Sequence, residues 1–228
     1  MATLTDFKTK LDQVLQDTAG VLGTTEKEAF IQEAVARYSQ DRPQETAAEI
    51  PGDNGFDYNL PAGWEEGFSA GRQVEYPAGQ QNPEILDDND WMLYQGASGK
   101  KLRFLNCSPG TGDTILLSFT KRHQVTTNSS TVPAADQDAV VNLAGALCCF
   151  ALSRKYAQTS EPTIAADAVN YQNKSGEYEK RGKTLEGLYK AHIARPADGG
   201  LAAASVSGDW DMNAGWGADR ITHPRRLR

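Results

Sequence analysis

The spacing of apolar residues changes from helical to strand-like near residue 44 and back near residue 128, and this switch constrains the fold of the 228-residue chain most. Residues 4–18 and 25–41 repeat apolar side chains at intervals of three and four, as one buried face of a helix requires. Residues 133–158 and 171–194 do the same. The segment between them has short apolar runs separated by glycine and proline, which is typical of strands. The pattern predicts an α+β fold.

Four runs in the middle segment predict strands. They are residues 72–77, 91–95, 100–106 and 114–120, and a short glycine-bounded loop at 96–99 joins the second run to the third as a hairpin. Three or four antiparallel strands are too few to bury much surface alone. We therefore expect this β module to pack on the helices or on another chain.

The two helices after the β module differ in character. Residues 133–158 are apolar on more than one face, so this helix should be buried between neighbours. Residues 171–194 instead carry a narrow seam suited to one partner surface. The seam consists of Tyr171, Ser175, Tyr178, Gly182, Leu185, Tyr189 and His192.

The charge distribution limits the possible partners. The chain has a formal net charge of −7, and residues 44–127 hold twelve acidic and only six basic side chains. This balance argues against a protein that binds nucleic acid by neutralising phosphates. No apolar run reaches the ~18–20 residues of a membrane span, and residues 1–8 do not resemble a signal peptide. We expect neither membrane insertion nor secretion.

No motif in the sequence indicates catalysis. His123, His192 and His223 have no second ligand at metal-binding spacing, and the three cysteines, at positions 107, 148 and 149, fit small core residues. The chain has neither a phosphate-binding P-loop nor a Gly-x-Ser-x-Gly nucleophile elbow. We expect no catalytic residue, no cofactor and no metal, and hence a protein that is not an enzyme.

The last 33 residues, 196–228, change composition again. They are rich in glycine and alanine and cannot form a core, yet they keep two tryptophans and end in a nonapeptide with four arginines and no acid. Such a segment is suited to order on a partner, with aromatic anchors and steering arginines. The candidate docking residues are Trp210, Met212, Trp216, Arg220, His223, Arg225, Arg226 and Arg228.

Several short stretches follow one another in a fixed order over nearly the whole chain. They are Ala34–Pro43, Val74–Pro77, Leu102–Leu105, Thr131–Asp136, Ala151–Ser160, Lys174–Tyr178, Gly208–Met212 and Thr222–Arg226. Taken in this order, they resemble the head-to-tail adaptor (connector) proteins of tailed bacteriophages.

The resemblance implies an architecture and a set of partners. It implies a four-helix adaptor bundle from residues 1–43 and 128–195, a small antiparallel β module inserted at 44–127, and an extended C-terminal docking tail at 196–228. It also implies a ring, usually of twelve copies, that is docked on the portal protein at the capsid vertex. The virion that contains this ring would be assembled in the host bacterial cytoplasm. A stopper or tail-completion protein would bind below, and genomic DNA would pass through the channel without sequence-specific binding.

Two other functions stay open at this point. The chain could be a stopper or tail-completion protein of the same neck, which would bind below the adaptor. It could also be a carbohydrate-binding β module that uses Trp64, Trp91 and Tyr94 as a stacking surface. Against the second alternative, these aromatic residues also fit the small core of the inserted module.

Overall fold

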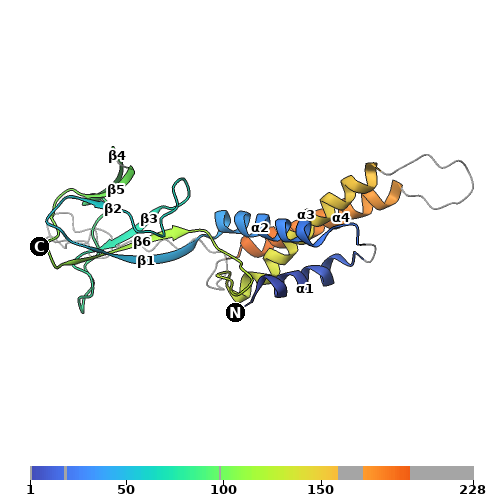
Figure 1. Ribbon diagram of the computed structural model, residues 1–228, viewed down its shortest axis with the longest axis horizontal. Coiled ribbons are helices and arrows are strands. Elements are labelled where there is room, and N and C mark those ends of the chain that lie inside the picture. Colours follow the sequence, from blue (N-terminus) through green and yellow to red (C-terminus); the bar gives the residue numbers. More distant parts are fainter. Residues whose placement is uncertain (1, 18–19, 98, 159–171, 196–228) are drawn as a thin grey trace, which may run out of the picture. The chain divides into compact units, whose positions relative to one another are not determined.

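The structure is a computed structural model, and residues 2–17, 20–97, 99–158 and 172–195 are described below. Within these ranges the fold is α+β, with four α-helices and two three-stranded antiparallel sheets (Figure 1). The described residues up to Ile193 belong to one compact unit. The helices are α1 (Leu4–Leu15), α2 (Thr24–Asp41), α3 (Gln137–Gln158) and α4 (Gln172–Ile193), and a short 3-10 helix, η1 (Ala134–Asp136), precedes α3.

Capping groups set the starts of the first two helices. Thr3 and Asp6 form a reciprocal capping box at α1, in which the Asp6 carboxylate accepts the Thr3 backbone N–H at 2.7 Å. Helix α2 begins earlier than the sequence predicts. Its cap is Gly23, whose backbone N–H donates to the Glu26 carboxylate at 2.9 Å, so the helix starts at Thr24 and not at residue 25.

Helix α3 forms the centre of the helical core. It lies among α1, α2 and α4 and contacts all three (Figure 1). Its buried positions lie on all sides of the helix. They are Ala139, Val140, Val141, Leu143, Ala144, Gly145, Ala146, Leu147, Cys148, Cys149 and Leu152. A helix that is apolar all round must be covered all round. The sequence prediction of a buried third helix is therefore confirmed.

The predicted four-helix adaptor bundle is wrong. In such a bundle the helices share one central core and each contributes one apolar stripe. Here α3 is itself the centre and the other helices cover it, while α4 packs chiefly on α3. The reason is compositional, because the middle of α3, from Leu143 to Cys149, has no polar side chain to expose, whereas α4 is polar over most of its surface.

Residues Ala134–Gln158 are long and apolar enough to cross a membrane by length and composition alone. Most of this stretch is buried inside the protein, where it packs against the other helices. The core helix of a folded domain meets the same length and composition test, and burial identifies α3 as such a helix.

Six strands form the two sheets in the described ranges. The first sheet has the order β1-β6-β3, from β1 (Gln44–Pro51), β6 (Thr114–Lys121) and β3 (Gly71–Glu75). The second sheet has the order β2-β5-β4, from β2 (Asp57–Asn59), β5 (Gly99–Phe104) and β4 (Trp91–Gly96). All pairings are antiparallel, and β4 with β5 is the hairpin that the sequence predicts.

The expected three or four strands are too few, and whether the strands also pack on another chain stays a prediction. The sequence pattern missed β1 and β2, and with them the strands form two sheets around a core of their own. The buried residues of this core are Ile50, Tyr58, Val74, Trp91, Leu102, Phe104, Ile115, Leu117 and Phe119. The sequence pattern does not predict strand β1, because polar and small residues occupy most of its positions and only Ile50 is buried.

The division of the chain into a helical part and an inserted β module stays a prediction. Its test is a chain in which a short Gly/Ser linker replaces residues 46–120, which leaves His123 and its partners in place. If the module is separable, the remaining helices should give a cooperative unfolding transition followed by circular dichroism at 222 nm. A helical signal that melts without cooperativity would show that helices and strands fold as one unit.

Two glycines of α4 provide a matched test of its packing on α3. A Cβ atom at Gly182 would lie 2.7 Å from the Phe150 ring, whereas one at Gly187 would meet nothing within 4 Å. Gly187→Ala should stabilise the protein by roughly 0.5–1 kcal/mol through helix propensity. Gly182→Ala should destabilise it by roughly 1–2 kcal/mol, because overpacking outweighs the same gain. Urea unfolding measures both values, and equal stabilisation by the two variants would contradict the α3–α4 contact.

Candidate assembly surfaces

The candidate docking residues of the tail lie outside the described residues. Trp210, Met212, Trp216, Arg220, His223, Arg225, Arg226 and Arg228 all belong to residues 196–228. Their role therefore stays a prediction. The described residues hold three other places where polar or apolar side chains gather, namely a buried cluster between helices, a groove between strands and an exposed sheet face.

A buried carboxylate joins three helical segments. Asp136, at the end of η1, accepts a hydrogen bond from the Tyr38 hydroxyl of α2. Its two oxygens lie 3.1 and 3.2 Å from an Arg42 guanidinium nitrogen, and Nε2 of His192, in the last turn of α4, lies 2.6 Å away. Asp136 is only 6% exposed. We call these four residues the Asp136 cluster.

Arg42 also caps the end of α4. Its second guanidinium nitrogen donates to the backbone carbonyls of His192 and Ile193 at 3.4 and 3.3 Å. The last carbonyls of a helix have no partner within the helix, and a cation is favourable there. One arginine at the end of α2 therefore satisfies the buried carboxylate and the α4 terminus together.

The charges in the Asp136 cluster stabilise one another. Burial raises the pKa of Asp136, but hydrogen bonds from His192 and Tyr38 and the charge of Arg42 lower it below the usual aspartate value. Burial and the hydrogen bond to Asp136 raise the pKa of Tyr38, so its hydroxyl stays protonated and donates. The carboxylate is thus ionised, and its hydrogen-bonding capacity is used within the protein. This arrangement fixes helices relative to one another.

His123 links the return of the chain from β6 to the same region. Its backbone N–H donates to the Ser39 hydroxyl at 2.9 Å, and its Nε2 lies 3.1 Å from the Arg42 carbonyl. Burial lowers the pKa of His123, which favours the neutral ring at neutral pH. Both contacts tie residue 123 to the last turn of α2, close to the point where the chain enters β1.

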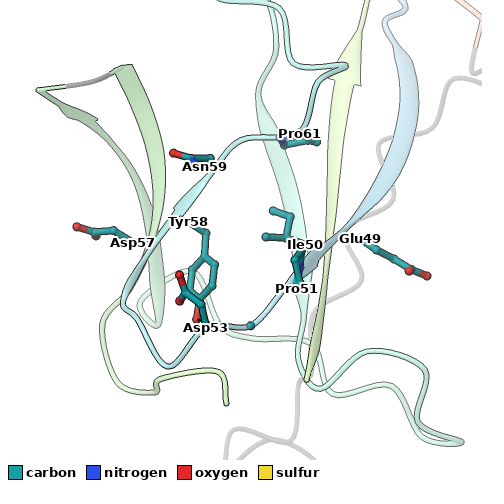
Figure 2. Close-up of a pocket in the computed structure, with 9 residues that line it drawn as sticks. Glu49, Ile50, Pro51, Asp53, Asp57, Tyr58, Asn59 and Pro61 are labelled. Carbon is teal, nitrogen blue, oxygen red and sulfur yellow. Dashed lines mark hydrogen bonds between the residues drawn. The ribbon is translucent and has the colours of Figure 1, made fainter. Parts of the chain in front are cut away.

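An open groove of about 370 Å³ lies between β1 and β2, the neighbouring edges of the two sheets. Figure 2 shows Ile50 and Tyr58 pointing into the space between the strands, whereas Glu49 and Asp57 point away from it. The Tyr58 hydroxyl donates to the backbone carbonyls of Gly55 and Pro109, at 3.0 and 3.1 Å. The groove floor is therefore apolar core, and its buried hydroxyl is already bonded within the chain.

The outer face of the β2-β5-β4 sheet carries a preorganised arginine. Arg103 binds both Asp57 oxygens, with N···O distances of 2.5 and 2.6 Å, and its guanidinium lies 4.2 Å from the centre of the Tyr94 ring. The Tyr94 hydroxyl also donates to Asp57 at 2.6 Å. The hydrogen bonds from Arg103 and Tyr94 lower the pKa of Asp57 to about 2. The charge of Arg103 is neutralised in this geometry.

Three large apolar side chains are exposed near that arginine. Phe56 and Leu105 are 56% and 47% exposed and line a hollow of about 450 Å³ together with Arg103. Met92 is 43% exposed and lies directly opposite Arg103 in the strand register. We call Phe56, Met92 and Leu105, with the Arg103–Asp57 pair among them, the sheet patch.

The aromatic residues considered for carbohydrate stacking do not share a surface. Trp91 is 9% exposed and belongs to the core between the sheets. Tyr94 comes three residues later in the same strand, so it projects to the opposite face. Trp64 packs against Phe119, with ring centres 5.7 Å apart. Trp91 is thus a core residue, Trp64 is partly buried against that core, and Tyr94 holds Asp57.

No metal site is found in the part of the chain that the structure describes, where no three His, Cys, Asp or Glu side chains could hold an ion together. Cys148 and Cys149 are buried, and burial raises the pKa of the Cys148 thiol to about 12. Such a thiol is unreactive at neutral pH. His123 and His192 both serve in contacts between structural elements.

Sequence reasoning missed both polar clusters. Arg42 and Asp136 each lie in one of the stretches that carry the family resemblance. The occurrence of both residues in such stretches was the only sequence signal for their contact. Asp57 and Arg103 gave no signal, because their pairing depends on β2, which the sequence pattern did not predict.

Asp136 and Asp138 form a matched pair for a stability test. Asp138 is exposed and pairs with Lys10 across a surface ion pair. Asp136→Asn should cost about 2–4 kcal/mol of unfolding free energy, because it leaves Arg42 without its buried counter-charge. Asp138→Asn should change stability by less than about 0.5 kcal/mol. Chemical denaturation at pH 7 measures both.

The contribution of Asp136 to the free energy of unfolding has a defined pH dependence. The pKa of Asp136 is lowered in the folded state, so its stabilisation is present above the ordinary value of 3.8 and is lost as the pH falls below it. The difference between wild type and Asp136→Asn should therefore shrink on acidification. A difference that stays constant down to acid pH would show that Asp136 is not ionised in the folded protein.

Comparison with known proteins gives limited likeness. No family model and no curated protein matches the sequence. Among solved structures, the chain is similar to a chain from the neck of an empty gene transfer agent particle, with 14% identity, a TM-score of 0.28, and coverage of 78% of this chain and 88% of that one. A chain from the neck of the native particle gives 15% identity and a TM-score of 0.27, and covers 77% of this chain and 86% of that one. A chain from the virion of the native gene transfer agent particle also gives 15% identity and a TM-score of 0.27, and the match covers 78% of this chain and 92% of that one. At these TM-scores the likeness carries no argument about this chain.

Proposed function

We propose that the protein is a structural component of the neck of a tailed phage or phage-like particle. The observation that carries the proposal is that two of the resembling stretches meet in the folded chain. Arg42 of Ala34–Pro43 pairs with Asp136 of Thr131–Asp136, at 3.1 Å and 94 residues apart in sequence. If these stretches belong to one fold, buried contacts between them are expected.

The chemistry of the described residues supports a structural role. The buried carboxylate is satisfied by three donors, the buried thiols are protonated, and the exposed arginine is neutralised by Asp57. These groups position elements or line surfaces, and none of them is poised for proton transfer or nucleophilic attack. A non-enzymatic protein that acts through its contacts fits this arrangement.

Within the neck, we propose the role of a ring-forming head-to-tail adaptor, in about twelve copies, that docks on the portal. A stopper or tail-completion protein would follow it, and DNA would pass through the ring. The net charge of −7, with twelve acidic against six basic residues between 44 and 127, would repel the phosphates. A channel that does not hold the phosphates lets DNA slide.

The proposed portal contact is the tail. Residues 196–228 carry the aromatic anchors and the arginines, and they follow a helix end that Arg42 holds in place. Burial of Trp210 and Trp216 in a groove on the portal would supply most of the affinity, and the terminal arginines would steer the approach.

Truncation after Arg195 tests this contact. The thermal midpoint should stay nearly unchanged, because no described core residue lies beyond Ile193. Binding to the purified portal ring, measured by biolayer interferometry, should be lost, and assembly with the truncated protein should yield heads without tails. Full portal binding by the truncated protein would move the contact to the described residues. If the protein instead bound only beneath an adaptor already on the portal, it would be the stopper.

Substitutions separate the two kinds of anchor. Trp210→Ala with Trp216→Ala should weaken portal binding by several kcal/mol at any salt concentration, since apolar burial is not screened. Arg225→Ala with Arg226→Ala should act mainly at low salt, because exposed charges are screened within about 8 Å at physiological ionic strength. Equal salt dependence of the two double variants would contradict these roles.

A further inference from the structure

Strand β1 has one paired edge and one free edge. It pairs with β6 in one continuous register and lies at the end of the strand order β1-β6-β3. The backbone N–H of Thr120, which lies opposite Glu45, donates to the Ala70 carbonyl at 3.0 Å and thus points away from β1. Because bonded and non-bonded pairs alternate along an antiparallel ladder, the backbone groups of Glu45, Ala47 and Glu49 point to the free edge. In the part of the chain that the structure describes, they make no backbone hydrogen bond outside the ladder.

The two edges of this sheet are built differently. At β3 the register shifts, and residues 84–86 pair with the strand, where the Leu86 N–H donates to the Val74 carbonyl at 2.9 Å. The free edge of β1 is instead bounded by Pro43, just before the strand, and Pro51, its last residue. Neither proline has a backbone N–H, so the bonding groups of the edge lie between them. A regular, uncovered edge is where another strand can add.

The groove between β1 and β2 lies along this free edge. Its lining includes Glu49 and Pro51 of β1 and Asn59 of β2. Ile50 and Tyr58 point into the space between the strands, so the floor of the groove is apolar (Figure 2). Side chains of an added strand would point alternately to the two faces of the sheet. The groove therefore favours apolar side chains at every second position of such a strand.

The outer face of β1 carries two carboxylates beside the free edge. Glu45 and Glu49 are exposed, and neither takes part in an ion pair among the described residues. The β6 residues directly opposite them, Thr120 and Leu116, are uncharged, and Lys121 lies opposite Gln44, on the other face of the strand pair. Opposite charges at directly opposed positions stabilise strand pairing. The two glutamates thus favour lysine or arginine on an added strand.

We propose that the free edge of β1 binds an extended segment of a partner protein by strand addition. Such a segment carries apolar side chains toward the groove and a basic side chain opposite each of Glu45 and Glu49, four residues apart. A second β1 does not fit, because antiparallel pairing centred on Ala47 sets Glu45 of one copy opposite Glu49 of the other. The inference goes beyond the proposed neck function, because it adds a contact surface besides the tail and names the kind of partner that fits it.

A synthetic strand tests the site on the full chain. The probe is the capped peptide Thr-Val-Lys-Val-Thr-Val-Lys-Thr, whose two lysines lie opposite Glu45 and Glu49 when its central threonine lies opposite Ala47. We expect saturable binding with a dissociation constant below about 1 mM. The largest amide chemical-shift changes in nuclear magnetic resonance spectra should fall at residues 44–51 and 57–59. The same peptide with glutamate in place of both lysines should bind at least about tenfold more weakly.

Backbone changes distinguish strand addition from general charge attraction. N-methylation of the central threonine removes an N–H that points at β1, so binding should weaken at least about tenfold. N-methylation of the valine before it removes an N–H that points away, and should change the affinity less than about threefold. On the protein, Ala47→Pro removes an edge N–H at an exposed position and leaves the bonds to β6 in place, so it should also weaken binding about tenfold.

Charge reversal tests the choice of partner. Glu45→Lys with Glu49→Lys should make the glutamate peptide the tighter ligand. Glu66→Lys with Asp88→Lys makes the same change in net charge at exposed positions that do not line the groove, and should keep the preference of the wild type for the lysine peptide. Far-UV circular dichroism should show the same fold for both double variants.

Four results would each overturn the proposal. They are no saturable binding of the lysine peptide below about 1 mM, equal loss of affinity for the two N-methylated peptides, the same preference in both double variants, and self-association of the wild type that Ala47→Pro abolishes. In the last case a second copy would be the occupant. None of these measurements involves a portal, so the strand-addition site and the neck function stand or fall separately.

Discussion

The helical region depends on one buried carboxylate. Asp136 is ionised, nearly inaccessible to water, and surrounded by the hydroxyl of Tyr38, the guanidinium of Arg42 and the imidazole of His192. A buried charge is costly unless each of its lone pairs is engaged, so the four side chains are only stable together. Because they come from α2, η1 and α4, the requirement for mutual satisfaction sets how these segments meet.

The same residues connect the helices to the strands. Strand β1 begins two residues after Arg42, and β6 ends two residues before His123. Arg42 and His123 contact each other through the Arg42 carbonyl. Entry to and exit from the β strands thus lie side by side at the end of α2. Two separate cores follow from this arrangement, one built on α3 and one between the two sheets.

Helical periodicity made the helices predictable, while the strands were predictable only where apolar residues were dense. Residues 137–158 and 172–193 form helices close to the predicted bounds, because long apolar repeats leave little ambiguity. Strand β2 has three residues, of which only Tyr58 is buried, and β1 reads as a polar segment. The bundle was mispredicted because periodicity reveals that a helix has an apolar face but not which helix lies at the centre.

The polar contacts were harder to predict from the sequence than the helices and strands were. The pairing of Arg42 with Asp136 joins residues 94 positions apart, and that of Arg103 with Asp57 depends on strand register. Neither follows from local spacing. Trp91 and Tyr94, by contrast, could be separated from sequence alone once β4 was identified, because an odd interval places them on opposite faces.

Two contacts of the α4 seam restrict how the length of this helix can vary between them. Gly182 lies against the Phe150 ring, and His192 reaches Asp136, so one contact fixes the helix at each end of this interval. Each inserted or deleted residue would rotate everything after it by about 100°. Relatives of this protein should therefore vary freely in sequence on the outer side of this interval, while the number of residues between its two contacts stays constant.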